Sequence, residues 1–331
     1  MKWKKGMMTF ALMAGIAVAA GCGKQEEPVN LTNVYMDRVE LAEVVIEDEA
    51  VALGEAPGAG PAVQKELTKV KASGIAEKRS DQAVIDYSHT GDGYVMVQFT
   101  ADTTKRLKAQ VKGPTTTYTY NLNQKEWTVF PLSDGNGAYQ VSVFQNVSGD
   151  RYAAVVSTSF DVTLSDEFAP FVRPNQYVDY EKAPNTMAKA AELTKGMTEP
   201  LKKVEAVYDY VVQNLTYDTE KARTVKSGYL PVLDTVLAEN KGICFDYAAL
   251  MTGMLRSQGI PCKLVVGYAG MIYHAWINVW TEETGWVDGV IYFDGSSWHR
   301  MDPTFASSNN QNAAILEYIG DGTNYKTKYL Y

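Results

Sequence analysis

The sequence predicts an α+β protein, in which an antiparallel β region is followed by a domain that runs from helix to strand. Between residues 81 and 165, apolar and polar side chains alternate with a period of two. From about residue 185, apolar side chains recur every three or four residues, which indicates helices. From residue 262 the alternation typical of strands returns. Helices and strands that are segregated along the chain in this way favour an α+β arrangement.

Length and charge limit the classes of protein that fit. The 331 residues are 46% hydrophobic and 21% charged, enough for about two globular domains and a leader. The formal net charge is −8, and removal of residues 1–22, which carry three lysines and no acid, lowers it to −11. An acidic chain without a basic stripe is a poor nucleic-acid binder, so no nucleic-acid partner is expected.

The first 22 residues are predicted to be an export signal. Three lysines precede an apolar run from Gly6 to Ala20, which is too short to span a bilayer comfortably. Small residues then lead to Cys22, in a pattern that resembles a bacterial lipoprotein signal, although such signals usually have Leu where Ala19 stands. The resemblance implies that Cys22 is lipidated and anchors a secreted protein to the outer face of the cell membrane. A plain signal peptide and an uncleaved anchor are the alternatives.

Two regions are expected between the leader and the helices. Residues 23–80 are interpreted as a linker or tether, because the stretch GEAPGAGPA is rich in Gly, Ala and Pro. Residues 81–165 are predicted to form a small antiparallel β-sandwich, since short alternating segments are separated by turn signals. These segments are centred on Val97, Ala109, Tyr120 and Val141. His89 lies in a turn-rich stretch and is expected to be a solvated surface side chain. The role of this domain is left open.

A second domain is predicted at 175–331, after a linker at 166–180 that contains two prolines. Within this domain a helix is expected to begin at Pro200, which follows Thr198 and Glu199. Its apolar face would be formed by side chains at helical spacing, namely Leu201, Val204, Tyr208, Val211 and Leu215.

Cys244 is the candidate nucleophile. Gly242 interrupts the preceding helix, and the apolar residues after Cys244 fit a buried helix that Gly259 and Pro261 bring to an end. This spacing places Cys244 in the first helical turn, where unpaired N–H groups and the helix dipole favour a thiolate. The same N–H groups could stabilise an oxyanion.

His274 is the candidate base for this nucleophile. It lies in the strand pattern YHAWINVW, whose alternation places Trp276 and Asn278 on the same face as His274. A catalytic imidazole needs an acceptor that orients it, and Asp302 at the end of the strand pattern WHRMDPT can serve. His299 falls on the other face of that strand from Asp302, so it is not expected in the site.

The stretch from about residue 200 to 305 resembles the transglutaminase-like superfamily of cysteine enzymes. GICFDYA surrounds the nucleophile, LRSQGIPCKLVVGY follows it, HAWINVW holds the base and WHRMDPTF holds the acid. These pieces occur in the order Cys, His, Asp that the superfamily uses. The resemblance implies a papain-like core, in which a helix carrying Cys244 packs against an antiparallel sheet carrying His274 and Asp302 as the catalytic triad.

Four further residues near the site have competing interpretations. Cys262 starts a strand without a local base and is expected to be a buried, disulfide-free small residue. Asp246 suits the dipole at the helix start, which we favour over a role in proton transfer. Trp276 either walls a substrate groove or packs in the core. The superfamily often has an aromatic or amide side chain upstream of the nucleophile as oxyanion donor, and Tyr229 is the candidate for this role.

The predicted triad supports acyl transfer from an amide through a thioester intermediate. Water as acceptor makes a cysteine peptidase or amidase, which we favour, whereas a lysine amine makes a cross-linking transglutaminase. A binding scaffold without activity is a third hypothesis. Peptide or protein substrates, in particular cell-wall-associated ones, fit the predicted surface location. No cofactor or metal is expected, because the three histidines lack ligand-like spacing and the calcium loop pattern DxDxDG is absent from the sequence.

Overall fold

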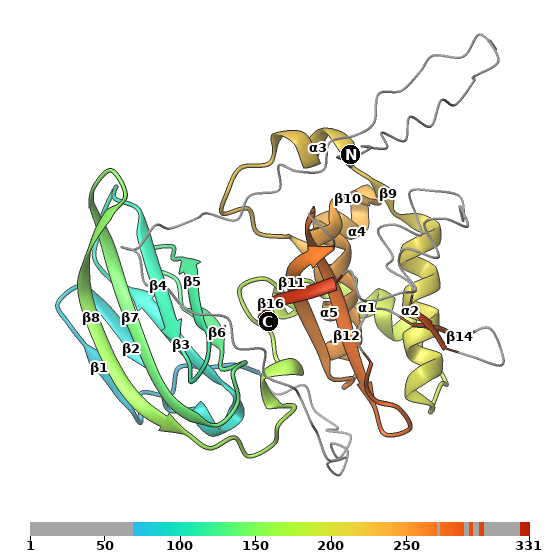
Figure 1. Ribbon diagram of the computed structural model, residues 1–331, viewed down its shortest axis with the longest axis horizontal. Coiled ribbons are helices and arrows are strands. Elements are labelled where there is room, and N and C mark those ends of the chain that lie inside the picture. The colour runs from blue at the N-terminus through green and yellow to red at the C-terminus, as the bar shows by residue number, and fades with distance from the viewer. Residues whose placement is uncertain (1–68, 270–271, 288–290, 294–297, 301–324) are drawn as a thin grey trace, which may run out of the picture. The chain divides into compact units, whose positions relative to one another are not determined.

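The structure, a computed structural model, describes residues 69–269, 272–287, 291–293, 298–300 and 325–331. The predicted leader, Cys22 and most of the predicted tether lie outside these residues. Within them the protein is α+β, with a β-rich region followed by a helical core and a further antiparallel sheet (Figure 1). The expected fold class is therefore confirmed.

The N-terminal region consists of two four-stranded antiparallel sheets. One sheet has the order β1 (Glu77–Arg79), β2 (Ala83–Asp86), β3 (Tyr94–Phe99) and β6 (Thr128–Pro131). The other has the order β5 (Thr117–Asn121), β4 (Leu107–Lys112), β7 (Gly137–Ser148) and β8 (Arg151–Val162). Strand β1 therefore lies within the predicted tether. The sequence did not predict it, because a three-residue edge strand without a fully buried side chain leaves no alternating pattern.

Inward-facing apolar side chains from both sheets form one core. The rings of Tyr120 in β5 and Phe130 in β6 lie 4.5 Å apart, and those of Tyr87 and Phe160 stack at 5.2 Å. Each pair joins the two sheets, so the alternation read from the sequence corresponds to the packed interior of a β-sandwich.

Residues 166–180 connect this sandwich to the helices, and they are more buried than a linker is expected to be. They contain two short 3-10 helices or parts of them, η3 (Ala169–Phe171) and the start of η4 (Tyr180–Lys182). Phe168, Tyr177 and Val178 have almost no exposed surface. The two prolines fix the backbone here without exposing it, because neighbouring aromatic side chains bury the segment.

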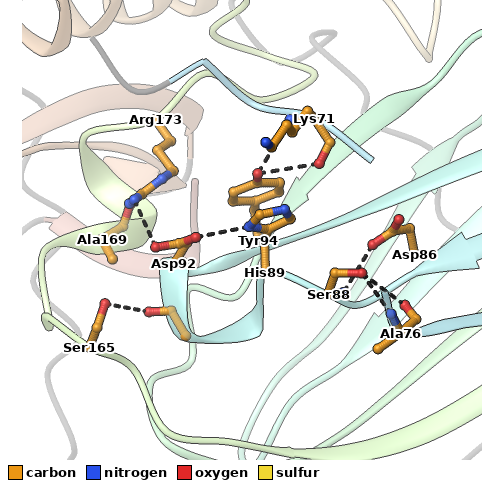
Figure 2. Close-up of polar contacts among 11 residues, drawn as sticks. Lys71, Ala76, Asp86, Ser88, His89, Asp92, Tyr94, Ser165, Ala169 and Arg173 are labelled. Carbon is orange, nitrogen blue, oxygen red and sulfur yellow. Dashed lines mark hydrogen bonds and ion pairs between the residues drawn. The ribbon is translucent and has the colours of Figure 1, made fainter. Parts of the chain in front are cut away.

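His89 is not the solvated surface side chain that the sequence predicted (Figure 2). The 3-10 turn η2 (Thr90–Asp92) brings the Asp92 carboxylate to 2.9 Å from His89 Nδ1, and the imidazole stacks on the Tyr94 ring at 5.2 Å. Arg173, from the connecting segment, reaches the same carboxylate at 3.2 Å and donates to the Ala169 carbonyl. This cluster attaches the connecting segment to the sandwich.

The helical core is built around helix α5 (Cys244–Ser257). Every residue of α5 from Cys244 to Arg256 is buried, because α1, α2, α4 and two strands pack around it. The other helices are α1 (Pro184–Leu193), α2 (Pro200–Asn214), α3 (Thr219–Thr224) and α4 (Leu233–Glu239). Helix α2 begins at Pro200 and buries Val204, Tyr208 and Val211, as predicted. Among the described helices, none combines the length and the apolar character that a bilayer crossing requires.

The remaining strands form an antiparallel sheet of order β13 (Gly285–Val287), β12 (Ile272–Thr281), β11 (Cys262–Ala269) and β16 (Tyr325–Leu330). Both β11 and β12 contact α5. A two-stranded unit, β14 (Ile291–Phe293) with β15 (Trp298–Arg300), corresponds to the hairpin expected around residues 294 and 295. The predicted segments 262–268 and 273–280 are therefore strands that pack on the central helix.

Candidate active site

Cys244 is the first residue of α5, as its spacing predicted. The chain enters the helix from a short parallel pair of strands, β9 (Thr216–Tyr217) with β10 (Lys241–Gly242). Ile243 is extended, with φ −96° and ψ 175°, and its carbonyl accepts hydrogen bonds from the N–H groups of Asp246 and Tyr247. Because the backbone turns from extended to helical at this residue, the thiol stands where α5 begins. It is 4% exposed and not in a disulfide.

Asp246, two residues further, carries a carboxylate with no exposed surface. One carboxylate oxygen, Oδ2, accepts from the Ile243 N–H at 2.8 Å and from Lys221 Nζ at 2.7 Å. The other, Oδ1, accepts from the Tyr229 hydroxyl at 2.5 Å. The carboxylate thus caps the helix, as a helix N-terminal acid should, and is also the centre of a buried ion pair.

The Tyr229 hydroxyl is bound within the Asp246 cluster. The hydroxyl has a single proton, which it donates to Asp246, and it accepts from Lys221 Nζ at 2.5 Å. Burial and the neighbouring carboxylate raise the pKa of Tyr229 above its ordinary value, so the hydroxyl stays protonated. The role of Tyr229 as an oxyanion donor stays a prediction of the resemblance, and in the structure its hydroxyl donates to Asp246.

His274 lies in β12, opposite Gly267 of β11, and is 5% exposed. Its ring stacks near Trp276 at 6.2 Å and lies 6.4 Å from Tyr325 of β16, and Trp276 meets Tyr325 edge-on at 5.1 Å. The predicted common face of His274 and Trp276 is confirmed. Trp276 is only 3% exposed, so of its two interpretations the structure supports core packing.

The other face of β12 points to α5. Tyr273, Ala275, Ile277 and Val279 belong to or pack against the core that contains the α5 side chains. The pKa of Tyr273 is raised mainly by burial and, to a smaller extent, by neighbouring tyrosines. The structure therefore brings the helix of Cys244 and the strand of His274 together, with Tyr273 on the face shared with α5 and His274 on the opposite face. The pairing of Cys244 with His274 stays a prediction.

Asp302, the predicted orienting acid, lies outside the described residues, and so does the Cys22 lipidation site. The backbone of His299 pairs with Tyr292 in the β14–β15 unit, and its side chain is not described. The triad as a whole is accordingly a prediction of the sequence.

Lys221 is the one member of the Asp246 cluster that sequence reasoning missed. It lies in the short helix α3, whose letters TEKART read as an ordinary solvated surface helix. Only its contact with Asp246, twenty-five positions away, distinguishes it from the other lysines. A buried acid at the start of the nucleophile helix was the available signal, because such an acid requires a cation or several donors.

Parts of the chain are similar to known proteins. Residues 187–289, which include Cys244 and His274, match a family model described as the transglutaminase-like superfamily. This matched segment of the chain is similar to members of that superfamily. The chain is 26% identical over 246 residues to the uncharacterized protein YebA of Bacillus subtilis strain 168, covering 64% of this chain and 30% of that protein.

Two enzymes are also similar to parts of the chain. A protein-glutamine gamma-glutamyltransferase of Pseudomonas aeruginosa is 29% identical over 119 residues, which is 31% of this chain and 17% of that protein. The crystal structure of red sea bream transglutaminase aligns with 64% of this chain and 48% of its own, at 14% identity and a TM-score of 0.29. The chain spans less than a third of the length of the two curated relatives.

Proposed function

We propose that this protein is a cysteine enzyme that forms an acyl-enzyme from peptide or side-chain amides. Cys244 Sγ bonds to the amide carbonyl carbon, and His274 accepts the thiol proton. The C–N bond then breaks, the amine leaves with the proton from His274, and Asp302 keeps the imidazole oriented throughout. A thioester on Cys244 remains.

The observation that carries this proposal is the position of Cys244 as the first residue of a fully buried helix, inside a segment matched by the superfamily model. At such a position the helix dipole and unpaired N–H groups stabilise both a thiolate and a developing oxyanion. Cys262 provides the contrast, since burial raises its pKa to about 11 and it begins a strand. Of the two cysteines in the described residues, we therefore assign the nucleophilic role to Cys244.

We favour hydrolysis of the thioester, and hence a peptidase or amidase. The alternative is transfer to a lysine amine, as the name of the Pseudomonas relative indicates for that protein. The two reactions share the first half and differ in the acceptor. Release of new termini from a casein substrate identifies hydrolysis, whereas incorporation of a labelled primary amine identifies a transglutaminase. Equal inactivity of the wild type and Cys244→Ala in both assays supports the scaffold hypothesis.

The proposed substrates lie outside the cytoplasm, because the leader ends in the predicted lipidation site Cys22. Expression of the full chain and of Cys22→Ala in a bacterial host, followed by membrane fractionation, tests the anchor. Wild type in the membrane pellet and the variant in the soluble fraction support lipidation. The same distribution for both proteins contradicts it.

The nucleophile–base pair is tested without knowledge of the substrate. Iodoacetamide is added to the chain without its leader at pH 6, where an ordinary protonated thiol reacts slowly. We expect Cys244 to be alkylated more than tenfold faster than Cys262, and the advantage to disappear in His274→Ala. Because β12 presents His274 on the face away from α5, this variant decides whether the imidazole acts on Cys244. An unchanged rate in His274→Ala contradicts its role as base.

A further inference from the structure

The ion pair beside the nucleophile has an arrangement that helix capping does not require. A helix N-terminal acid is ordinarily solvated, yet the Asp246 side chain has no exposed surface whereas the Lys221 side chain is 26% exposed. A buried carboxylate is costly unless donors surround it. Lys221, Tyr229 and the Ile243 N–H supply these donors at 2.5–2.8 Å.

The donors come from three separate segments of the chain. Lys221 belongs to α3, Tyr229 to the loop before α4, and Ile243 to the turn directly before Cys244. The Lys221 ammonium also lies 4.2 Å from the centre of the Tyr229 ring, so these two side chains pack against each other as well as binding the carboxylate. Asp246 therefore fastens α3 and the following loop to the first turn of the nucleophile helix.

The backbone around this turn is shaped for the contact. The Gly242 carbonyl accepts from the Asp218 N–H at 2.8 Å, which continues the β9–β10 pairing to the start of α3. A Cβ on Gly242 would stand 2.5 Å from the Cβ of Asp246 and 3.0 Å from its Oδ2. Only a residue without a side chain lets the carboxylate fold back onto the Ile243 N–H.

Charge gives the cluster a consequence for chemistry. Asp246 and Cys244 lie on the same helical turn, and a carboxylate opposes the formation of a second negative charge beside it. Lys221 offsets the carboxylate charge, and Tyr229 holds the ammonium and the carboxylate in register. Without them, the helix start would present Cys244 next to an uncompensated anion.

We propose that Lys221, Tyr229 and Asp246 form a positioning cluster for Cys244, which fixes the first turn of α5 and offsets the carboxylate charge beside the nucleophile. This inference rests on the proposed role of Cys244 as nucleophile. None of the three side chains is assigned a contact with substrate, so Lys221 and Tyr229 act through Asp246.

The test measures the rate of Cys244 alkylation by iodoacetamide at pH 6, together with the melting temperature, in wild type, Lys221→Met, Lys221→Arg and Tyr229→Phe. We expect Lys221→Met to lower the rate about tenfold or more, and Tyr229→Phe to lower it less, because only the first removes a charge. Lys221→Arg should restore most of the rate. In the double variant that combines Lys221→Met with Tyr229→Phe, the loss of alkylation rate should be smaller than the two single losses combined, since both donors act on one carboxylate.

Matched controls come from a second lysine–tyrosine pair. Lys189 of α1 lies with its Nζ 5.6 Å from the centre of the Tyr210 ring of α2 and pairs with Glu192. Lys189→Met and Tyr210→Phe should therefore keep the wild-type rate. If Lys221→Met does not fold, the alkylation rate of Tyr229→Phe tests the proposal, because this substitution removes only one oxygen atom. Wild-type rates in Lys221→Met and Tyr229→Phe overturn the proposal, and so does a loss in Lys221→Met that Lys221→Arg does not restore.

Failure of this proposal and failure of the proposed function are distinguishable. His274→Ala reports on the nucleophile–base pair, whereas the Lys221 and Tyr229 variants report on the cluster. A rate that depends on His274 but not on the cluster retains the enzyme and removes the positioning role. A rate that depends on the cluster but not on His274 retains the electrostatic role and removes the base.

Discussion

Each end of helix α5 lies beside one buried cysteine and carries one buried charged side chain, but the partners of the two charged side chains differ. At the N-terminal end, Asp246 is bound by a cation and a hydroxyl from other segments, and Cys244 is adjacent. At the C-terminal end, the Arg256 guanidinium donates to the main-chain carbonyls of Arg173, Cys262 and Tyr331. Acid at the helix start and base at its end both suit the dipole.

The difference between the ends lies in their partners. Main-chain carbonyls cannot change charge, and burial lowers the pKa of Arg256 only to about 10, so this end keeps a fixed charge at neutral pH. The Arg256 side chain joins α5 to the connecting segment, to β11 and to Tyr331, which follows β16. The N-terminal end instead relies on a lysine that is partly exposed to solvent. We infer that the C-terminal end holds the fold and that the N-terminal end is adapted to reaction.

The largest expected effect is on stability at the C-terminal end. Arg256→Met should lower the free energy of unfolding by about 3–5 kcal/mol, since it leaves buried carbonyls without donors. Arg256→Lys should recover little, because an ammonium cannot reproduce the fork of the guanidinium. Urea denaturation measures both, with Arg223→Lys on exposed α3 as a control near wild type. A stable Arg256→Lys would show that charge alone suffices here.

Gly242→Ala should destabilise the N-terminal end by about 1–3 kcal/mol, because the new Cβ would stand 2.5 Å from the Cβ of Asp246. The matched control is Gly253→Ala within α5, whose Cβ would lie 2.6 Å from Leu233 Cδ1, the end of a flexible side chain. Urea denaturation and the alkylation rate of Cys244 are measured together. Equal effects of the two substitutions would mean that Asp246 can move aside.

A third prediction concerns alkaline pH and Cys262. Burial raises the pKa of this thiol from 9.0 to about 11. The unfolded chain therefore loses the proton first, and folding loses stability as the pH rises from 9 towards 11, by about 2 kcal/mol at the upper limit. Cys262→Ala should be less stable at pH 7 yet lose less stability over this range than wild type. Identical pH dependence of the two proteins in urea denaturation would refute it.

The smallest expected effect is at the start of α3. Although burial acts in the opposite direction, the Lys221 N–H and the Lys241 ammonium hold the pKa of Asp218 below its ordinary value. The stability that Asp218 contributes is fully present above its pKa in the unfolded chain, and it is lost as the pH falls through its pKa in the folded protein. Lys241 is half-exposed, so Lys241→Met should cost well under 1 kcal/mol at pH 7. Thermal unfolding at pH 7 and pH 3 should show a smaller difference from wild type at pH 3.

The sequence predicted local features of the chain better than contacts between distant residues. The start of α5 at Cys244 and the shared face of His274 and Trp276 follow from local spacing, and both are found. His89 was placed in solvent, because no local pattern shows that Tyr94 and Asp92 enclose its ring. The contact of Tyr229 with Asp246 was not foreseen, since the two residues lie seventeen positions apart in the chain.

By itself, the sequence determined the α+β order of elements, the helix start at Cys244 and the resemblance to the superfamily, because helix and strand periods, glycine, proline and short motifs are local properties. Only the tertiary structure decided which charges meet at that helix start. Asp246, Lys221 and Tyr229 come from segments separated by loops and a helix. Their contacts depend on how β9, β10 and α3 pack, and the burial that makes an ion pair necessary does not exist until the chain has folded.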